Sequence, residues 1–296
     1  MILVTGGTGF IGQVLIRQLI SNGYEVRLLL RPSKTTPELP KGMPLDVVLA
    51  SVTDVRGMRA AMHDVTTVIH LVTGENKGSK TDLFEVDIES TRVVSQAAME
   101  TGVDRIIYLS HLGADRASAY PVLKMKGIAE NYIKTSGVDY TILRSALVFG
   151  QMDHLTNGIK RLLKMSPLFF FLPGDGLTMI QPLWVEDLVG CITGALESER
   201  SKNRVYEIGG IDYFTIQEIV QIIQDRIKNR NKIIHLHPAY MRILTVILEH
   251  ALPSFPITTF WLDYLSATRT CAIDSIPREF GILPSRFTEK IGYITP

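Results

Sequence analysis

The sequence predicts an α/β fold, in which a doubly wound parallel sheet is followed by a smaller C-terminal region. Short apolar segments alternate with amphipathic helical segments along the first 150 residues. The first apolar segment runs directly into Gly6, Gly9 and Gly12 and then into a helical pattern. Alternation of this kind places helices on both faces of a parallel sheet. A glycine turn between a strand and a helix is typical of a nucleotide-binding site.

Each glycine of this turn has a separate physical role. Gly6 permits the sharp bend, Gly9 lets the backbone approach a pyrophosphate, and Gly12 lets the helix pack closely on the strand. The free N–H groups and the positive dipole end of the helix then face the phosphates. The alternative is an ordinary strand-to-helix turn. The residues expected to bind a cofactor here are Gly6, Thr8, Gly9, Phe10, Ile11 and Gly12.

Arg31 follows the second predicted strand, Glu25–Leu30, and indicates which cofactor is preferred. An acid at this strand end binds the ribose 2′-hydroxyl of NAD, whereas an arginine accommodates the 2′-phosphate of NADP. We therefore expect NADP(H) to be preferred, with NAD(H) possible, and Lys34 to be a second phosphate partner. The alternative interpretation of Arg31 is a solvated loop charge.

The remaining elements of the first half continue the alternation. Asp54 is placed to cap a short helix, and Gly102 to end a long one. Strands are expected at 46–49, 67–71 and 105–109, and helices at 54–62, at 82–101 and from 120 onward.

Ser110, Tyr120 and Lys124 form a candidate catalytic set. Ser110 follows the fifth strand, while Tyr120 and Lys124 lie four residues apart and share one helix face. A phenol at this place can transfer a proton, an ammonium beside it lowers its pKa, and a serine hydroxyl can orient a carbonyl. Because Tyr-x-x-x-Lys is common on helices, the prediction depends on its position just after Ser110.

The order of these motifs resembles the short-chain dehydrogenase/reductase superfamily in its extended or atypical form. The branch it is most similar to includes NmrA-like proteins and the nucleotide-binding accessory subunit of respiratory complex I. The resemblance implies a Rossmann-type NAD(P)-binding domain over 1–150 and a substrate-binding region over 151–296 that is interleaved with the last sheet elements. It also implies that Ser51, Leu71 and Lys126 contact the cofactor. The residues that carry it are Thr5–Gly12, Ser110, Tyr120–Lys124, Thr141–Arg144, Gln181–Asp187, Tyr206–Gly210 and Phe214–Glu218.

Departures from the family pattern bear on catalysis and on adenine binding. Asp87 stands where extended members usually place asparagine, and Ser51 stands where an acid often meets the adenine. A second alignment makes Lys126 the family lysine and puts Val122 at the tyrosine position. Tyr120 would then lie six residues before the lysine and off its helical face. Both registers stay open at this point.

Three functions are compatible with these features. We expect an NADP(H)-dependent oxidoreductase that acts on a carbonyl or alcohol of a small substrate, an apolar one being an option. The alternative is a non-catalytic NADP(H)-binding protein with an accessory, assembly or redox-sensing role. The third function is a nucleotide-sugar epimerase or dehydratase. It is weakened because the substrate region shows few candidate arginines beyond Arg242 and Arg269 for binding a sugar diphosphate.

Composition limits the partners. With 31 basic and 30 acidic residues and a net charge of +1, the chain carries no electrostatic signature of nucleic-acid binding. Its two cysteines have neither metal-ligand nor disulfide spacing, so no metal is expected. The first strand starts at residue 2 and leaves no room for a cleaved signal peptide, which predicts a cytoplasmic protein. We expect a small-molecule substrate and a monomer or homodimer.

The second half contains apolar segments of two kinds. Leu162–Gly176 reads as an apolar loop that lines a pocket or contacts a partner, unless Phe169–Phe171 fill a core. Residues 241–252 and 255–265 are apolar but shorter than the ~20 residues that cross a bilayer. Residues 239–268 could therefore form a surface for a peripheral membrane or protein partner, or a packed helical cap.

Overall fold

The computed structural model describes residues 1–32, 44–75, 82–166, 168–252 and 255–296. The chain divides into two compact units. Unit 1 comprises Met1–Gly74, Asp82–Arg144 and Leu188–Glu207, and unit 2 comprises mainly Ser145–Asp187 and Ile208–Pro296. A segment from the second half of the sequence thus belongs to unit 1, and the predicted domain boundary at residue 150 stays a prediction.

A seven-stranded sheet with the order β11-β6-β5-β4-β1-β2-β3 forms the centre of unit 1. The pairings that join β1 to β2 and β4, β2 to β3 and β4 to β5 are all parallel. Strand order reverses beside β1, which is where such sheets bind ligands at their carboxyl ends. The predicted doubly wound α/β fold is confirmed. The strands are β1 (Ile2–Thr5), β2 (Val26–Leu30), β3 (Asp46–Leu49), β4 (Thr67–His70), β5 (Arg105–His111), β6 (Asp139–Ser145) and β11 (Arg204–Ile208).

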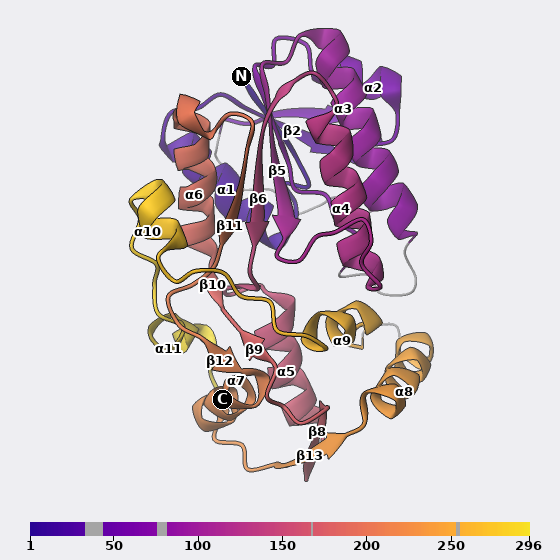
Figure 1. Cartoon of the computed structure of the whole chain (residues 1–296), viewed down its shortest axis with the longest axis vertical. Coiled ribbons are helices and arrows are strands. Elements are labelled where there is room, and N and C mark those ends of the chain that lie inside the picture. The colour runs from indigo at the N-terminus through magenta and orange to yellow at the C-terminus, as the bar shows by residue number, and fades with distance from the viewer. Residues whose placement is uncertain (33–43, 76–81, 167, 253–254) are drawn as a thin grey trace. The chain divides into compact units, whose positions relative to one another are not determined.

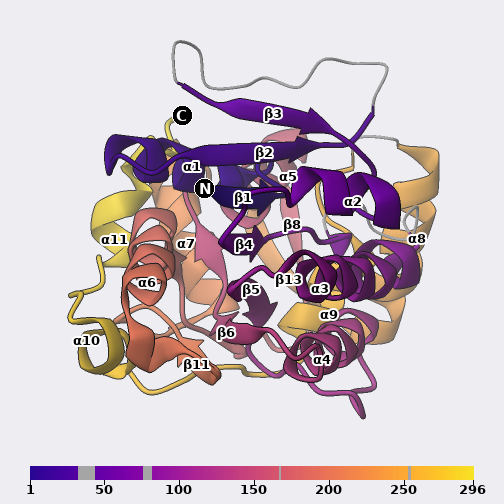
Figure 2. The same cartoon turned by 90° about the horizontal axis from the view of Figure 1, so that it is seen from above.

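Helices cover both faces of this sheet (Figure 2). The buried positions of α1, Leu15, Ile16 and Leu19, recur at helical spacing and pack on one face. Two helices lie on that face, α1 (Phe10–Ser21) and α6 (Val185–Glu197), and three on the other, α2 (Val55–Ala61), α3 (Ser90–Thr101) and α4 (Pro121–Lys134).

Local sequence explains where these helices begin and end. The Asp54 carboxylate accepts the Arg56 N–H at 3.1 Å, as an N-cap does. Pro121 occupies the first turn of α4 directly after Tyr120, the N-cap residue. Gly102 ends α3 with a φ of 72°, the left-handed conformation that glycine adopts without strain.

The helix predicted over 82–101 contains a π-helical segment, Phe84–Glu89, before α3 begins. The Ser90 hydroxyl donates to the Val86 carbonyl, and the Thr91 hydroxyl donates to the Asp87 carbonyl at 2.7 Å. Side chains that bond carbonyls four residues earlier disturb the regular ladder. Widened turns of this kind often carry functional residues, and here the turn carries Asp87.

Unit 2 has its own core, in which α5 and α7 pack on each other and on β8. Thr215 and Glu218 form a reciprocal capping box that starts α7. Its helices are α5 (His154–Met165), α7 (Ile216–Ile227), α8 (Pro238–Ala251), α9 (Thr259–Leu265), α10 (Ser275–Phe280) and α11 (Phe287–Lys290). Its short strands pair as β7 (Val148–Phe149) with β10 (Leu183–Trp184), β9 (Met179–Ile180) with β12 (Phe214–Thr215), and β8 (Phe169–Pro173) with β13 (Lys232–Leu236). Single 3₁₀ turns occur at Glu199–Ser201 and Ile291–Tyr293.

The prediction of one apolar loop over Leu162–Gly176 is wrong. Its first residues complete α5, and Phe169–Pro173 is strand β8, paired in parallel with β13. Phe170 and Leu172 are buried while Phe169 and Phe171 are exposed, which is the alternation of a strand with one packed face. Of the three phenylalanines, only Phe170 fills a core.

The two later apolar stretches form α8 and α9, with α8 directly following β13 (Figure 1). None of the helices in the described ranges combines the length and the apolar character needed to cross a membrane.

Candidate functional site

The glycine turn after β1 is closely packed on two sides. Gly6 has a φ of +76°, and a Cβ there would lie 2.9 Å from the carbonyl carbon of Leu71. A Cβ on Gly12 would lie 2.5 Å from both the Gly6 oxygen and the Gly7 Cα. Both positions therefore require glycine, because β4 and α1 approach the turn more closely than a side chain allows.

Gly9, by contrast, faces open space. A Cβ there would meet only the Gly6 oxygen, at 3.3 Å, and the residue is exposed. Gly9 is the N-cap of α1, no side chain caps this helix, and its first turn contains no acidic residue. The first N–H groups of α1 have no partners within the helix. This cradle fits an anion such as the pyrophosphate of a dinucleotide.

The other predicted cofactor residues follow neighbouring strands. Arg31 is exposed directly after β2, and Leu71 directly follows β4. Ser51 lies just beyond β3, with its hydroxyl 2.9 Å from that of Thr53. Lys34 lies outside the described residues. Since parallel strands end at one edge, Arg31, Leu71 and the glycine turn share that edge of the sheet.

Behind the edge lies a buried polar layer centred on His70. Its Nδ1 is 2.6 Å from the Thr5 hydroxyl, its Nε2 is 3.1 Å from the Thr91 hydroxyl, and its ring stacks on Tyr108. Burial, with the positive charge of Lys126, lowers the pKa of His70 to about 3. Burial also raises the pKa of Tyr108 to about 12. Both rings are therefore neutral packing groups at physiological pH.

A buried ion pair joins α4 to the π-helical segment Phe84–Glu89. The Lys126 ammonium lies 3.1 Å from Asp87 Oδ1, and both side chains are almost completely buried. The other Asp87 oxygen, Oδ2, accepts the Gly74 N–H at 2.9 Å. The Lys126 nitrogen also lies 5.1 Å from the centre of the Tyr108 ring. The Asp87 carboxylate thus contacts both Lys126, the family lysine of the second register, and the Gly74 backbone at the sheet edge.

One turn further along α4, Glu130 collects four donors. Ser110 donates to Oε1 at 2.7 Å, and Lys134 donates to Oε2 at 3.1 Å. Arg144 bonds both oxygens, at 2.9 Å from Nε and 2.8 Å from Nη2. Burial raises the pKa of Glu130, but the hydrogen bonds from Arg144 and Ser110 outweigh it, so its pKa lies below its ordinary value.

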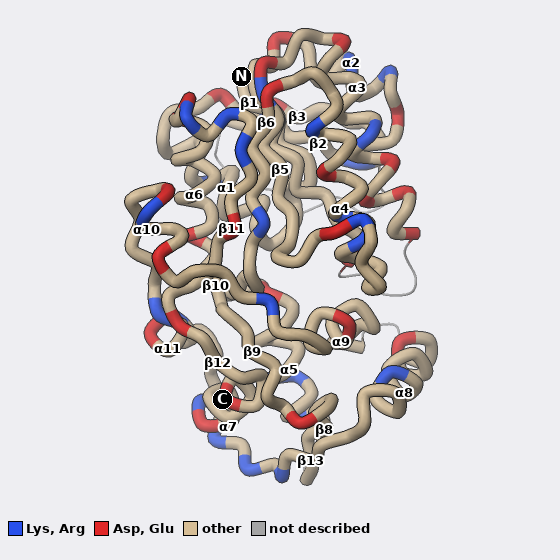
Figure 3. Tube along the Cα trace, viewed as in Figure 1, with Lys and Arg blue, Asp and Glu red and all other residues tan. Residues whose placement is uncertain are grey.

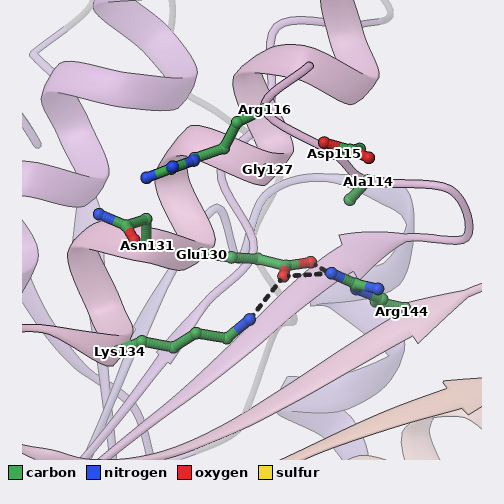
Figure 4. Close-up of a pocket in the computed structure, with 8 residues that line it drawn as sticks. All are labelled: Ala114, Asp115, Arg116, Gly127, Glu130, Asn131, Lys134 and Arg144. Carbon is green, nitrogen blue, oxygen red and sulfur yellow. Dashed lines mark hydrogen bonds and ion pairs between the residues drawn. The ribbon is translucent and has the colours of Figure 1, made fainter. Parts of the chain in front are cut away.

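Glu130 also lines a small polar cavity of about 290 Å³ (Figure 4). Figure 4 shows the Arg144 and Lys134 side chains converging on the Glu130 carboxylate. The cavity is lined by Ala114, Asp115, Arg116, Gly127, Glu130, Asn131, Lys134 and Arg144.

The three residues of the predicted catalytic set have different surroundings. Ser110 is completely buried and bonded to Glu130, Tyr120 is the half-buried N-cap of α4, and Lys124 is exposed. Val122 stands one turn before Lys126. The catalytic roles of Ser110, Tyr120 and Lys124, and the cofactor contact of Lys126, stay predictions.

Asp87 and Glu130 are site residues to which the sequence analysis gave no role. For Asp87 the one signal was its occurrence where the extended family usually has asparagine. Across residues 1–32, 44–75, 82–166, 168–252 and 255–296, no cluster of histidine, cysteine, aspartate and glutamate is suited to a metal ion.

The amino-acid sequence is similar to a known protein family and to several known proteins. Residues 6–161 match the family described as NAD(P)H-binding. The chain is 31% identical to mitochondrial NADH dehydrogenase [ubiquinone] 1 alpha subcomplex subunit 9 of Arabidopsis thaliana, over 76% of this chain and 57% of that protein. It is 24% identical to the photosystem II assembly factor Ycf39 of Synechocystis sp., over 99% and 89% respectively. The matches span little more than half the length of the complex I relatives from Arabidopsis thaliana and Rattus norvegicus.

Solved structures share the fold. An NADPH-dependent quinone oxidoreductase from Escherichia coli, complexed with NADPH, aligns with a TM-score of 0.79 and 17% identity over 99% of both chains. A nucleoside-diphosphate-sugar epimerase from Staphylococcus aureus aligns with a TM-score of 0.78 and 18% identity, also over 99% of both chains. At these identities the likeness concerns the fold alone.

Proposed function

The chain belongs to the NAD(P)H-binding family, and on that premise we propose that it is a nucleotide-binding accessory or assembly protein without dehydrogenase turnover. It is an NAD(P)-binding protein of the short-chain dehydrogenase/reductase type, homologous to the complex I subunit and to Ycf39. The proposal adds that the bound nucleotide serves structure or redox sensing.

The register of α4 is the observation that carries the proposal. In the family pattern, a phenol stands one turn before the lysine, where it can pass a proton to the substrate oxygen. The lysine that is buried and paired in this chain is Lys126, and one turn before it stands Val122. Tyr120, six residues before Lys126, lies on another side of the helix. An aliphatic side chain at position 122 cannot donate a proton.

Ser110, which was expected to orient a substrate carbonyl, already uses its hydroxyl in a bond within the protein. The Ser110 hydroxyl donates to Glu130, whose two oxygens are shared with Arg144 and Lys134. A hydroxyl that donates to a carboxylate is not available to donate to a substrate carbonyl. Ser110 therefore joins β5 to α4 in this proposal.

A nicotinamide nucleotide, when bound, supplies a hydride. The residues that hold the nucleotide are the exposed Gly9 and the uncapped start of α1 for the pyrophosphate, with Arg31 for a 2′-phosphate. Arg31 stands at the strand end where NAD-binding proteins carry an acid, which supports a preference for NADP(H). Asp87 fixes the neighbouring loop through the Gly74 N–H.

A protein partner is the second part of the proposal. The relatives are named as a subunit of NADH dehydrogenase and as a photosystem II assembly factor. We infer that this chain likewise contacts a protein assembly.

One experiment with two measurements tests this function. Calorimetric titration of the full chain should show NADPH binding more tightly than NADH. Arg31→Asp should remove that preference by weakening NADPH about tenfold or more, the loss of one charge-assisted pair. Arg204→Asp is the matched control, because Arg204 is an exposed arginine on β11, at the other edge of the sheet, and it should leave both affinities unchanged.

The same preparation is then assayed for NADPH oxidation with aldehydes, ketones and quinones. We expect no turnover above background, and we expect Tyr120→Phe to change neither binding nor the background rate. Turnover that Tyr120→Phe abolishes would overturn the proposal and establish an oxidoreductase of the usual kind. Absence of binding by either nucleotide would remove the premise itself.

A further inference from the structure

Helix α8 presents its apolar face outward. Tyr240, Ile243 and Ile247 are 70%, 59% and 58% exposed, and their spacing places them on one helix face. Thr245 and Glu249, on the opposite side, are 1% and 5% exposed. A surface helix normally turns its apolar stripe to the core and its polar residues to water. In α8 the inward face holds Met241 beside the polar Thr245 and Glu249, and three bulky apolar side chains lie outward.

Polar contacts fix this orientation. Glu249 Oε1 accepts the Thr259 N–H at 3.0 Å, at the start of α9. Arg242 forms an ion pair with Asp263, which is buried on α9. Turning α8 over would break both contacts, which is costly where the carboxylates are buried. The outward apolar face is therefore the stable one.

Two segments of unit 2 that include most of α8 are rich in basic residues, while the acidic residues of α8 and α9, Glu249 and Asp263, are buried. Strand β8 contacts α5 and α8 and pairs with β13. Residues 154–174 and 226–248 contain eight lysines and arginines and no aspartate or glutamate, and the acids that flank them are Asp153, Asp175, Asp225 and Glu249. Figure 3 shows the basic positions along the connection from α7 to β13 and on α5 and α8. They are Lys160, Arg161, Lys164, Arg226, Lys228, Arg230, Lys232 and Arg242.

Further apolar side chains are exposed in the same segments. Leu168, Phe169 and Phe171 are exposed on and just before β8, and Met165 is exposed at the end of α5. Exposed apolar groups among basic residues are the composition of a segment that lies in a membrane interface.

We propose that α8, with the basic segments 154–174 and 226–248, docks this protein on the surface of an anionic lipid bilayer. With 14 residues α8 is too short to cross the hydrocarbon core. It would lie in the plane of the interface, with Ile243 and Ile247 among the acyl chains and the cations on the acidic headgroups. A second copy of the chain would bring the same positive charge to the contact and repel it, whereas an anionic bilayer complements it. This docking is independent of the proposed nucleotide function.

Flotation of the full chain with lipid vesicles tests the proposal. We expect binding to phosphatidylcholine vesicles that contain phosphatidylglycerol, with at least tenfold weaker binding to phosphatidylcholine alone and a loss of binding as salt rises. Ile243→Asp combined with Ile247→Asp should lower binding about tenfold or more. Lys164→Gln, Arg230→Gln and Lys232→Gln together should lower only the binding to anionic vesicles.

The matched control is Leu177→Asp with Leu283→Asp, two exposed leucines of unit 2 outside the basic segments, which should bind as the wild type does. Thermal unfolding of each variant establishes that it is folded. The proposal is overturned if the wild type ignores anionic vesicles, or if the control loses as much binding as the Ile243 and Ile247 variant. Sedimentation that reveals a dimer broken by that variant, without vesicle binding, would assign the face to a second copy and also overturn it.

Discussion

Helices α4 and α8 are both 14 residues long and both have proline in the first turn, yet they place their charges and apolar groups differently. In unit 1, α4 buries Lys126 and Glu130 and surrounds each with partners from the same unit. In unit 2, α8 buries Glu249 and leaves Ile243 and Ile247 in solvent. The buried, paired charges of α4 form a site inside unit 1. The outward apolar face of α8 indicates a surface that binds a partner outside the chain.

The largest effect is expected at the buried pair of α4. Lys126→Met leaves the Asp87 carboxylate buried beside an apolar side chain, so the free energy of unfolding should fall by about 3–5 kcal/mol. Urea denaturation followed by circular dichroism measures it. Lys124 is an exposed lysine on the same helix, so Lys124→Met is the control. It should change the free energy of unfolding by no more than about 0.5 kcal/mol. Equal losses of unfolding free energy in the two variants would contradict a stabilising ion pair between Lys126 and Asp87.

A smaller effect is expected one turn further along α4. Glu130→Gln removes the charge that binds Arg144 and Lys134, whose side chains are 24% and 33% exposed and can turn to water. The loss should therefore be about 1–3 kcal/mol at pH 7.

The stability that Glu130 contributes also depends on pH. Because its folded pKa lies below the ordinary 4.5, this stability is fully present above pH 4.5 and is lost as the pH falls through the folded pKa. The gap between wild type and Glu130→Gln should thus narrow on acidification. A gap that stays constant from pH 7 to pH 3 would contradict the assigned ion pairs.

The smallest effect on folding is expected on the outward face of α8. Ile243→Gln with Ile247→Gln should change the free energy of unfolding by no more than about 0.5 kcal/mol, because neither side chain is buried. Met241→Gln, on the inward face of the same helix and 7% exposed, should lose about 2–3 kcal/mol. If the Ile243 and Ile247 substitutions lower the free energy of unfolding as much as Met241→Gln does, that face of α8 packs against this chain and the contrast with α4 is wrong.

The sequence predicted the fold of unit 1 because its signals are local. Apolar periodicity indicated the strands and helices, the glycine turn indicated the start of α1, and Asp54 and Gly102 marked helix ends that the structure confirms. Such signals act within a few residues of the chain, so they can be recognised without knowledge of the tertiary structure.

The remaining features depend on contacts between distant residues. Strand β8 was taken for a loop because its partner, β13, begins more than fifty residues later. The Lys126–Asp87 pair joins two helices, and only its geometry distinguishes Lys126 from the exposed Lys124. The apolar residues of α8 gave a correct helical period, but period alone does not tell which face is buried.

The two oxygens of the Asp87 carboxylate make two different contacts, so a substitution at position 87 affects both. One oxygen accepts the Gly74 N–H and the other faces the Lys126 ammonium. An asparagine at 87 could still accept the N–H but would leave the ammonium beside an uncharged amide. Asp87→Asn should therefore keep the backbone at the sheet edge in place while removing the ion pair that holds Lys126.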